Sequence, residues 1–294
     1  MQLQSCNECP RRCGAARGEG QHMGFCGMPG TFRVARVALH PFEEPCLCGK
    51  NGAGTVFFCG CNLRCVFCQN RDISYGKNRG EALSPDELAE KLLALQDAGA
   101  ACVDLVTPTH YTRELVPVLR ALRPALRVPV VWNSGGYEDP DVLRELSGLV
   151  DIFLPDCKYF SSSLSEKYSH AADYFTVCRS ALREMLRQVG RPDFGADGSL
   201  LRGVIVRHLV LPGCRHDSIA LLRALASEFG TDAFLLSLMS QYTPDFAPPD
   251  ADRPLRRRLT TFEYESVRAE ANRLGFSGFS QSLSSASAAY TPDF

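Results

Sequence analysis

From Phe58 to Asn70 the chain reads FCGCNLRCVFCQN, and this stretch decides how the whole sequence is interpreted. Its cysteines Cys61, Cys65 and Cys68 are separated by three and then two residues, directly after an apolar run that is typical of a buried strand. Three thiolates at this spacing fit three corners of a cubane cluster. The motif therefore predicts a four-iron four-sulfur cluster whose fourth iron has no protein ligand. A structural zinc site fits less well, because such sites usually have four ligands in two pairs.

A second group of cysteines lies near the start of the chain. Cys6, Cys9, Cys13 and Cys26 occur in a short segment with too few apolar residues for a core of its own, so a bound metal would supply its folding free energy. Zinc and a second iron–sulfur cluster both fit four thiolates, and unliganded thiols are the alternative. We expect Cys59, beside the central motif, to be a buried thiol and not a ligand.

Short apolar runs alternate with amphipathic helical patterns after residue 50. The runs are residues 55–59, 102–107, 129–133, 150–155, 204–211 and 234–239. The helical patterns are residues 84–98, 113–122, 140–149, 174–189, 217–229 and 261–274. This alternation predicts an α/β fold with a parallel sheet, either open or rolled into a partial (β/α)6 barrel. We divide the chain into a cysteine-rich metal-binding extension (1–50), which contains a predicted strand at 32–39, a barrel (51–276) and a tail (277–294).

The composition limits the partners and the compartment. The 294 residues include 32 basic and 33 acidic residues, so the net charge of -1 gives no field that would attract nucleic acid. No apolar stretch is long enough to cross a membrane, and the first residues lack the apolar core of a secretory signal. With 14 cysteines in clusters, we expect a reduced, cytoplasmic protein that binds metal.

Polar residues gather where the predicted strands end, which is where barrel enzymes build their sites. Candidate cofactor-binding side chains at these ends are Thr107, Thr109, Asn133, Ser134, Asp156, Lys158, Arg207 and Gln241. Two histidines, His110 and His208, are candidate catalytic groups that would orient a substrate or relay a proton, although an imidazole that satisfies a loop is the alternative. Glu43 and Glu44 precede a proline; we expect these carboxylates to face solvent, and the alternative is that they face the cluster region.

The central motif, with an aromatic residue before its last cysteine, resembles the signature of the radical S-adenosylmethionine superfamily. The core from about residue 55 to 274 is similar to the activating enzymes of glycyl-radical enzymes such as pyruvate formate-lyase, and in particular to their uncharacterised relatives. The shared phrases are residues 9–11, 43–45, 107–110, 151–156, 207–213 and 239–242.

This resemblance implies a TIM-like barrel in which the cluster cleaves S-adenosylmethionine reductively and a 5′-deoxyadenosyl radical abstracts hydrogen. It implies an oxidoreductase that acts on a protein or peptide and takes electrons from flavodoxin or ferredoxin. The alternatives are radical modification of a small molecule and a non-catalytic iron–sulfur or zinc protein.

The family's cofactor-binding positions carry over to five residues of this sequence. Asn133, Ser134 and Asp156 resemble positions that hold the carboxylate end of the cofactor, and Lys158 and Arg207 resemble its basic neighbours. Residues 107–109 stand where the family has a Gly-Gly-Glu turn for the methionyl amine, and residue 242 is tyrosine where activating enzymes have histidine.

Overall fold

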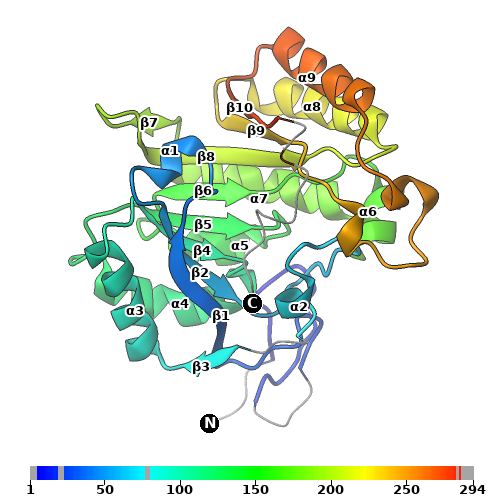
Figure 1. Cartoon of the computed structure of the whole chain (residues 1–294). Helices are drawn as coiled ribbons and strands as arrows, with labels where there is room; N and C mark the ends of the chain where they lie inside the picture. The colour runs from blue at the N-terminus through cyan, green and yellow to red at the C-terminus, as the bar shows by residue number, and fades with distance from the viewer. Residues whose placement is uncertain (1–4, 19–22, 77–79, 283–284, 286–294) are drawn as a thin grey trace.

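The six apolar runs form six parallel strands, each of which pairs with the next. The computed structural model describes residues 5–18, 23–76, 80–282 and 285 (Figure 1). The strands are β2 (Ala53–Phe58), β4 (Val103–Val106), β5 (Val130–Ser134), β6 (Ile152–Pro155), β8 (Leu200–Leu209) and β9 (Leu235–Met239). The predicted α/β fold is confirmed as a partial barrel of six parallel strands.

Further strands extend both edges of this sheet. The predicted strand at residues 32–39 is confirmed as β1 (Phe32–His40), which pairs antiparallel with β2 and with β3 (Glu81–Leu83). At the opposite edge β10 (Gly278–Ser280) lies parallel to β9, and β7 (Asp193–Phe194) pairs with β8. Strands from the predicted extension (1–50) and tail (277–294) thus belong to the same sheet as the barrel strands. The division of the chain at residues 50 and 276 stays a prediction.

A helix follows each parallel strand and covers the outside of the sheet (Figure 1). These helices are α3 (Pro85–Asp97), α4 (Thr112–Leu122), α5 (Pro140–Leu143), α7 (Tyr174–Val189), α8 (Arg215–Phe229) and α9 (Thr261–Leu274). The helix predicted at 84–98 begins with a capping box, in which Glu87 is bonded back to the backbone of Ser84. The helix predicted at 140–149 is shorter than expected: it continues only as η2 (Arg144–Leu146), because Gly148 takes a positive φ of 76°.

Inward-facing side chains alternate along the strands and form layers inside the barrel. The layer at the amino-terminal ends of the strands is apolar: Ala53, Cys102, Val131, Ile152, Ile205 and Leu235. A short helix, α1 (Pro45–Cys48), packs Cys46 and Leu47 against this layer and closes that end of the barrel. Two residues further along the same strands lie polar side chains, which we call the polar layer: Asp104, Asn133, Arg207 and Ser237. The barrel interior is thus apolar at one end and polar above it.

The N-terminal segment is tied to the barrel by Arg11. Its guanidinium donates to the backbone carbonyls of Asn62 at 2.8 Å and Ser169 at 3.0 Å, and also to that of His170. The same group lies 4.0 Å from the centre of the Phe25 ring, which adds a cation–π contact. The cysteine-rich segment therefore packs directly against the loop that carries the central motif.

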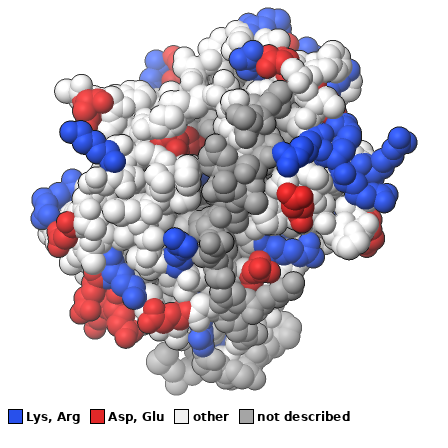
Figure 2. Space-filling view, in the orientation of Figure 1, with Lys and Arg blue, Asp and Glu red and all other residues white. Residues whose placement is uncertain are grey.

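On the face shown in Figure 2, basic side chains gather in one large group at the right edge and acidic side chains in one at the lower left, with smaller groups of both signs elsewhere. This distribution agrees with the nearly balanced composition. Among the described residues, no helix has the length and apolar character needed to cross a membrane.

Candidate active site

The central cysteine motif forms a loop directly after β2, at the carboxyl-terminal end of the barrel. Each of its three thiols has a hydrogen-bond partner. The backbone N–H of Leu63 donates to Cys61 Sγ at 3.3 Å, and the Ser169 hydroxyl donates to Cys65 Sγ at 2.9 Å. Cys68 Sγ lies 3.4 Å from Ser74 Oγ. Ser169 belongs to α6 (Ser162–Ser169), a helix that the sequence analysis did not predict.

These interactions suit sulfur ligands, because hydrogen bonds to a cluster's sulfurs tune its electron affinity. The three thiols need not converge on one point, since in a cubane cluster each would ligate a different iron. Cys59 is fully buried, as predicted, at the end of β2. The loop therefore fits the cluster that its spacing predicts.

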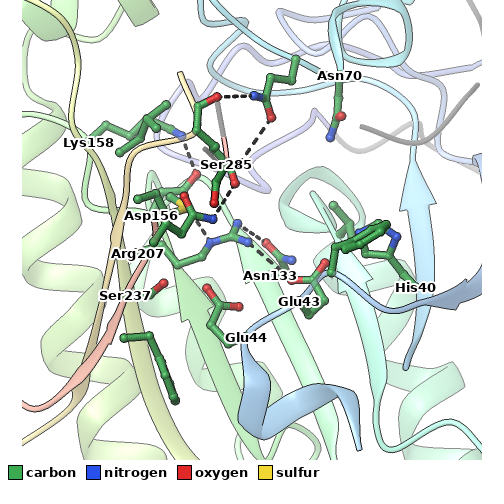
Figure 3. Close-up of a pocket in the computed structure, with 18 of the residues that line it drawn as sticks. His40, Glu43, Glu44, Asn70, Asn133, Asp156, Lys158, Arg207, Ser237 and Ser285 are labelled. Atoms are coloured by element: carbon green, nitrogen blue, oxygen red, sulfur yellow. Dashed lines mark hydrogen bonds and ion pairs between the residues drawn. The ribbon is translucent and has the colours of Figure 1, made fainter. Parts of the chain in front are cut away.

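A cavity of about 670 Å³ lies inside the barrel and reaches the motif at Cys65 and Cys68 (Figure 3). Its walls come from the polar layer, from the segment after β1 and from the C-terminal residues around β10. Besides Cys65 and Cys68, five of the predicted cofactor-binding residues line it: Asn133, Asp156, Lys158, Arg207 and Gln241. The fold thus brings together residues that were predicted at the ends of four separate strands.

Arg207 connects the groups inside this cavity. Its Nε donates to Asp156 Oδ1 at 3.0 Å and its Nη2 donates to Asn133 Oδ1 at 2.6 Å. Asp156 also forms an ion pair with Lys158. Burial alone would raise the pKa of Asp156, but the charges of Lys158 and Arg207 bring it below its usual value. Asp156 is therefore an ionised carboxylate held between two cations.

Three carboxyl groups, which we call the carboxyl cluster, lie deeper in the barrel: Glu43, Glu44 and Asp104. Asn133 Nδ2 donates to Asp104 Oδ2 at 3.1 Å, and Glu43 Oε2 lies 3.7 Å from Arg207 Nη1. Burial raises the pKa of each of the three groups above its usual value. The expectation that Glu43 and Glu44 face solvent is wrong, because α1 folds under the barrel and turns the preceding residues into the cavity.

The two candidate catalytic histidines lie away from this cavity. His110 is buried and its Nε2 bonds the Cys59 carbonyl at 2.7 Å, while His208 Nδ1 bonds the Cys157 carbonyl at 2.7 Å. Burial lowers the pKa of His110 to about 3 and also lowers that of His208, so both rings are neutral. Their catalytic role stays a prediction that this placement does not favour. His208 follows the inward-facing Arg207, so it points to the other face of β8.

Three further candidates also lie outside the cavity lining. Thr109 is buried and donates to Glu138 at 2.8 Å, and the Ser134 hydroxyl accepts from the Gly136 N–H at 3.2 Å. Thr107 has a φ of 59°, a left-handed conformation that is rare for a β-branched residue. This turn keeps a sharp bend after β4, at the place where the resembled family has glycines.

The four N-terminal cysteines lie near one another beside the central loop. Cys9 and Cys26 are buried, Cys6 is half-buried and Cys13 is exposed. Burial, with smaller contributions from the nearby Cys26 and Cys6, raises the pKa of Cys9 to about 12. Throughout the described ranges, no three His, Cys, Asp or Glu side chains converge on a point suited to a single metal ion.

Comparison with known proteins agrees with this architecture. Residues 55–188 match the family described as the Radical SAM superfamily. The chain belongs to this superfamily, whose members cleave S-adenosylmethionine reductively with an iron–sulfur cluster. Among its relatives is a protein of Methanocaldococcus jannaschii described as "Uncharacterized protein MJ0674", 30% identical over 275 residues, which are 90% of this chain and 73% of that protein.

Solved structures show the same fold at low identity. A radical SAM methyltransferase from Sphaerobacter thermophilus superposes with a TM-score of 0.51 at 14% identity, covering 78% of this chain and 66% of that one. SuiB from Streptococcus suis, bound to S-adenosylmethionine, gives a TM-score of 0.51 at 12% identity, covering 76% of this chain and 48% of that one. The chain thus spans about two thirds of the first protein and half of the second.

Proposed function

We propose that the chain is a radical enzyme that abstracts hydrogen from a substrate held in the barrel cavity. The observation that carries this proposal is the junction of the cysteine loop and the cavity, which Cys65 and Cys68 line together with Asp156, Lys158 and Arg207. A non-catalytic iron–sulfur protein needs no enclosed polar cavity beside its cluster.

In this proposal Cys61, Cys65 and Cys68 hold the cluster, and Asn133, Asp156, Lys158 and Arg207 hold S-adenosylmethionine. The bound cluster and cofactor supply a 5′-deoxyadenosyl radical. The chain's own groups orient the cofactor: Lys158 and Arg207 line the cavity and present two cations to a carboxylate.

The substrate proposed first is a protein or peptide, because the sequence resembles activating enzymes of glycyl-radical enzymes. A small molecule is the second candidate, and one observation favours it. The apolar layer and α1 close one end of the barrel beneath the carboxyl cluster, which makes the cavity a pocket with a polar floor.

We also propose two features of electron supply. Flavodoxin or ferredoxin would reduce the cluster. The thiols of Cys6, Cys9, Cys13 and Cys26 would hold a second metal centre, either zinc or an iron–sulfur cluster, next to the central loop. Support comes from the clustering of these thiols and from the Arg11 contacts that fix the segment against Asn62.

The test is anaerobic reconstitution with iron and sulfide, reduction, addition of S-adenosylmethionine and chromatography for 5′-deoxyadenosine. Cys65→Ala should abolish the product, whereas Cys59→Ala, which removes a buried thiol outside the motif, should retain it. If the wild-type protein forms no 5′-deoxyadenosine, or if Cys65→Ala matches the wild type, the proposed function is wrong.

A further inference from the structure

The floor of the barrel cavity carries two carboxyl groups, Glu43 and Glu44, and a third, Asp104, is buried behind it. We propose that the carboxyl cluster of Glu43, Glu44 and Asp104 binds a cationic group of the substrate, an ammonium or guanidinium. This inference rests on the proposed function, because it assigns a chemistry to the substrate of the same cavity.

The charge balance favours this assignment. Among the described residues that line the cavity, Glu43, Glu44 and Asp156 share it with the cations Arg207 and Lys158, and burial lowers the pKa of His40 beside them (Figure 3). Both cations already form ion pairs with Asp156, and the contact of Arg207 with Glu43 is longer, at 3.7 Å. An added cation would therefore meet carboxylates that have no full partner.

Unpartnered oxygens point to the same ligand. Glu44 is 8% exposed and lines the cavity, and its Oε2 has no hydrogen-bond partner among the described residues. Asp104 is fully buried, and its Oδ1 lacks a partner in the same part of the chain. Buried acceptors without a donor destabilise a protein. Glu44 places such an oxygen on the cavity wall, which indicates a ligand that donates, and Asp104 lies buried behind the lining residue Asn133. Ammonium and guanidinium groups donate only, with three and five N–H bonds.

The carboxyl cluster lies deeper in the barrel than the residues proposed to bind S-adenosylmethionine. Asp104 pairs with Thr55 in the middle of β2, several residues before the cysteine loop. The groups assigned to S-adenosylmethionine, Asp156 and Lys158, follow the end of β6, near Cys65. The cluster therefore suits an organic cation below the cofactor.

Isothermal titration of the anaerobically reconstituted protein tests the inference. Butylamine and butylguanidine serve as probes, and 1-butanol serves as the neutral probe of similar shape. We expect the cationic probes to bind at least about tenfold more tightly than butanol, and Glu44→Gln to weaken them about tenfold, since a charge-assisted hydrogen bond is lost. Glu90→Gln, a change of the same chemistry on the exposed face of α3, should leave binding unchanged.

Two further measurements cover the case in which Glu44→Gln does not fold. Glu43→Gln should weaken the binding of the same cationic probes. Titration of the wild type with these probes in buffers of different ionisation heat should show proton release, because a bound cation favours the ionised carboxylates. Equal binding of butylamine and butanol, or cationic binding that S-adenosylmethionine displaces one for one, would overturn the inference. If 5′-deoxyadenosine forms while the amines do not bind, this inference fails and the proposed function stands.

Discussion

The hydrogen bond from Ser169 to Cys65 gives the most direct prediction about the cluster. Replacing Ser169 by alanine removes a 2.9 Å O–H donor from a cluster ligand in a fully buried position. The Tyr159 hydroxyl lies 2.7 Å from Ser169 Oγ, so the serine is held in place and the lost interaction is well defined. We expect the reduction potential of the cluster to fall, because the bond stabilises the more negative reduced state more strongly.

The size of this shift follows from the geometry. A hydrogen bond to a charged group contributes about 1.5–3 kcal/mol, and the part that differs between oxidation states is about 1 kcal/mol. For a one-electron couple this corresponds to about 40 mV, since about 59 mV is equivalent to 1.4 kcal/mol. The Ser169→Ala protein should therefore have a potential about 40 mV more negative than the wild type.

An anaerobic redox titration followed by electron paramagnetic resonance measures this potential. Ser163→Ala is the matched control, because Ser163 lies on the same helix α6 but is exposed and bonds only Ser161. Equal potentials for Ser169→Ala and Ser163→Ala, or a shift to a more positive value, would refute the assigned role of Ser169.

Three other outcomes are expected. Burial raises the pKa of Glu44 above its usual 4.5, so the contribution of Glu44 to stability falls as pH rises from that value. In urea unfolding Glu44→Gln should therefore gain stability over the wild type as pH rises above 4.5, and a pH-independent difference would contradict this. Arg11→Ala should destabilise the protein by about 2–4 kcal/mol in the same assay, because its hydrogen bonds to the carbonyls of Asn62 and Ser169 are lost. The side chain of Arg12 is 70% exposed, so Arg12→Ala should have a clearly smaller effect. Equal effects of the two changes would exclude a special role for Arg11. Cys9→Ser should lower the metal content by one centre while Cys178→Ser does not, and unchanged metal would rule out an N-terminal site.

Much of the fold could be predicted because the parallel strands are buried on both faces. Their apolar runs and the intervening helical patterns are strong local signals, and all six strands lie where expected. The elements that were missed have weak signals. Gly278–Ser280 joins the sheet only through its neighbour β9, and residues 162–169 are mainly polar. α1 has four residues, too few for a periodic pattern.

The candidate site was predicted less completely, because strand ends reveal position but not direction. Arg207 and His208 are adjacent in sequence, yet only Arg207 faces the cavity. Alternation along β8 could have separated them. Asp104 was overlooked, although a carboxylate in the middle of an apolar run is itself a signal of function. Glu44 depends on the path of α1, which no local pattern encodes.

The small strand β10 has a consequence for how the chain tolerates shortening. A chain that ended before Gly278 would keep every cysteine and every charged group of the cavity, but β9 would become a bare sheet edge. Such an edge offers unpaired backbone groups to other chains and favours aggregation. Loss of Phe279 and Gln281 would also open the wall of the cavity to solvent, where a radical is quenched. The last described strand thus protects both the solubility of the protein and the lifetime of the species that it would generate.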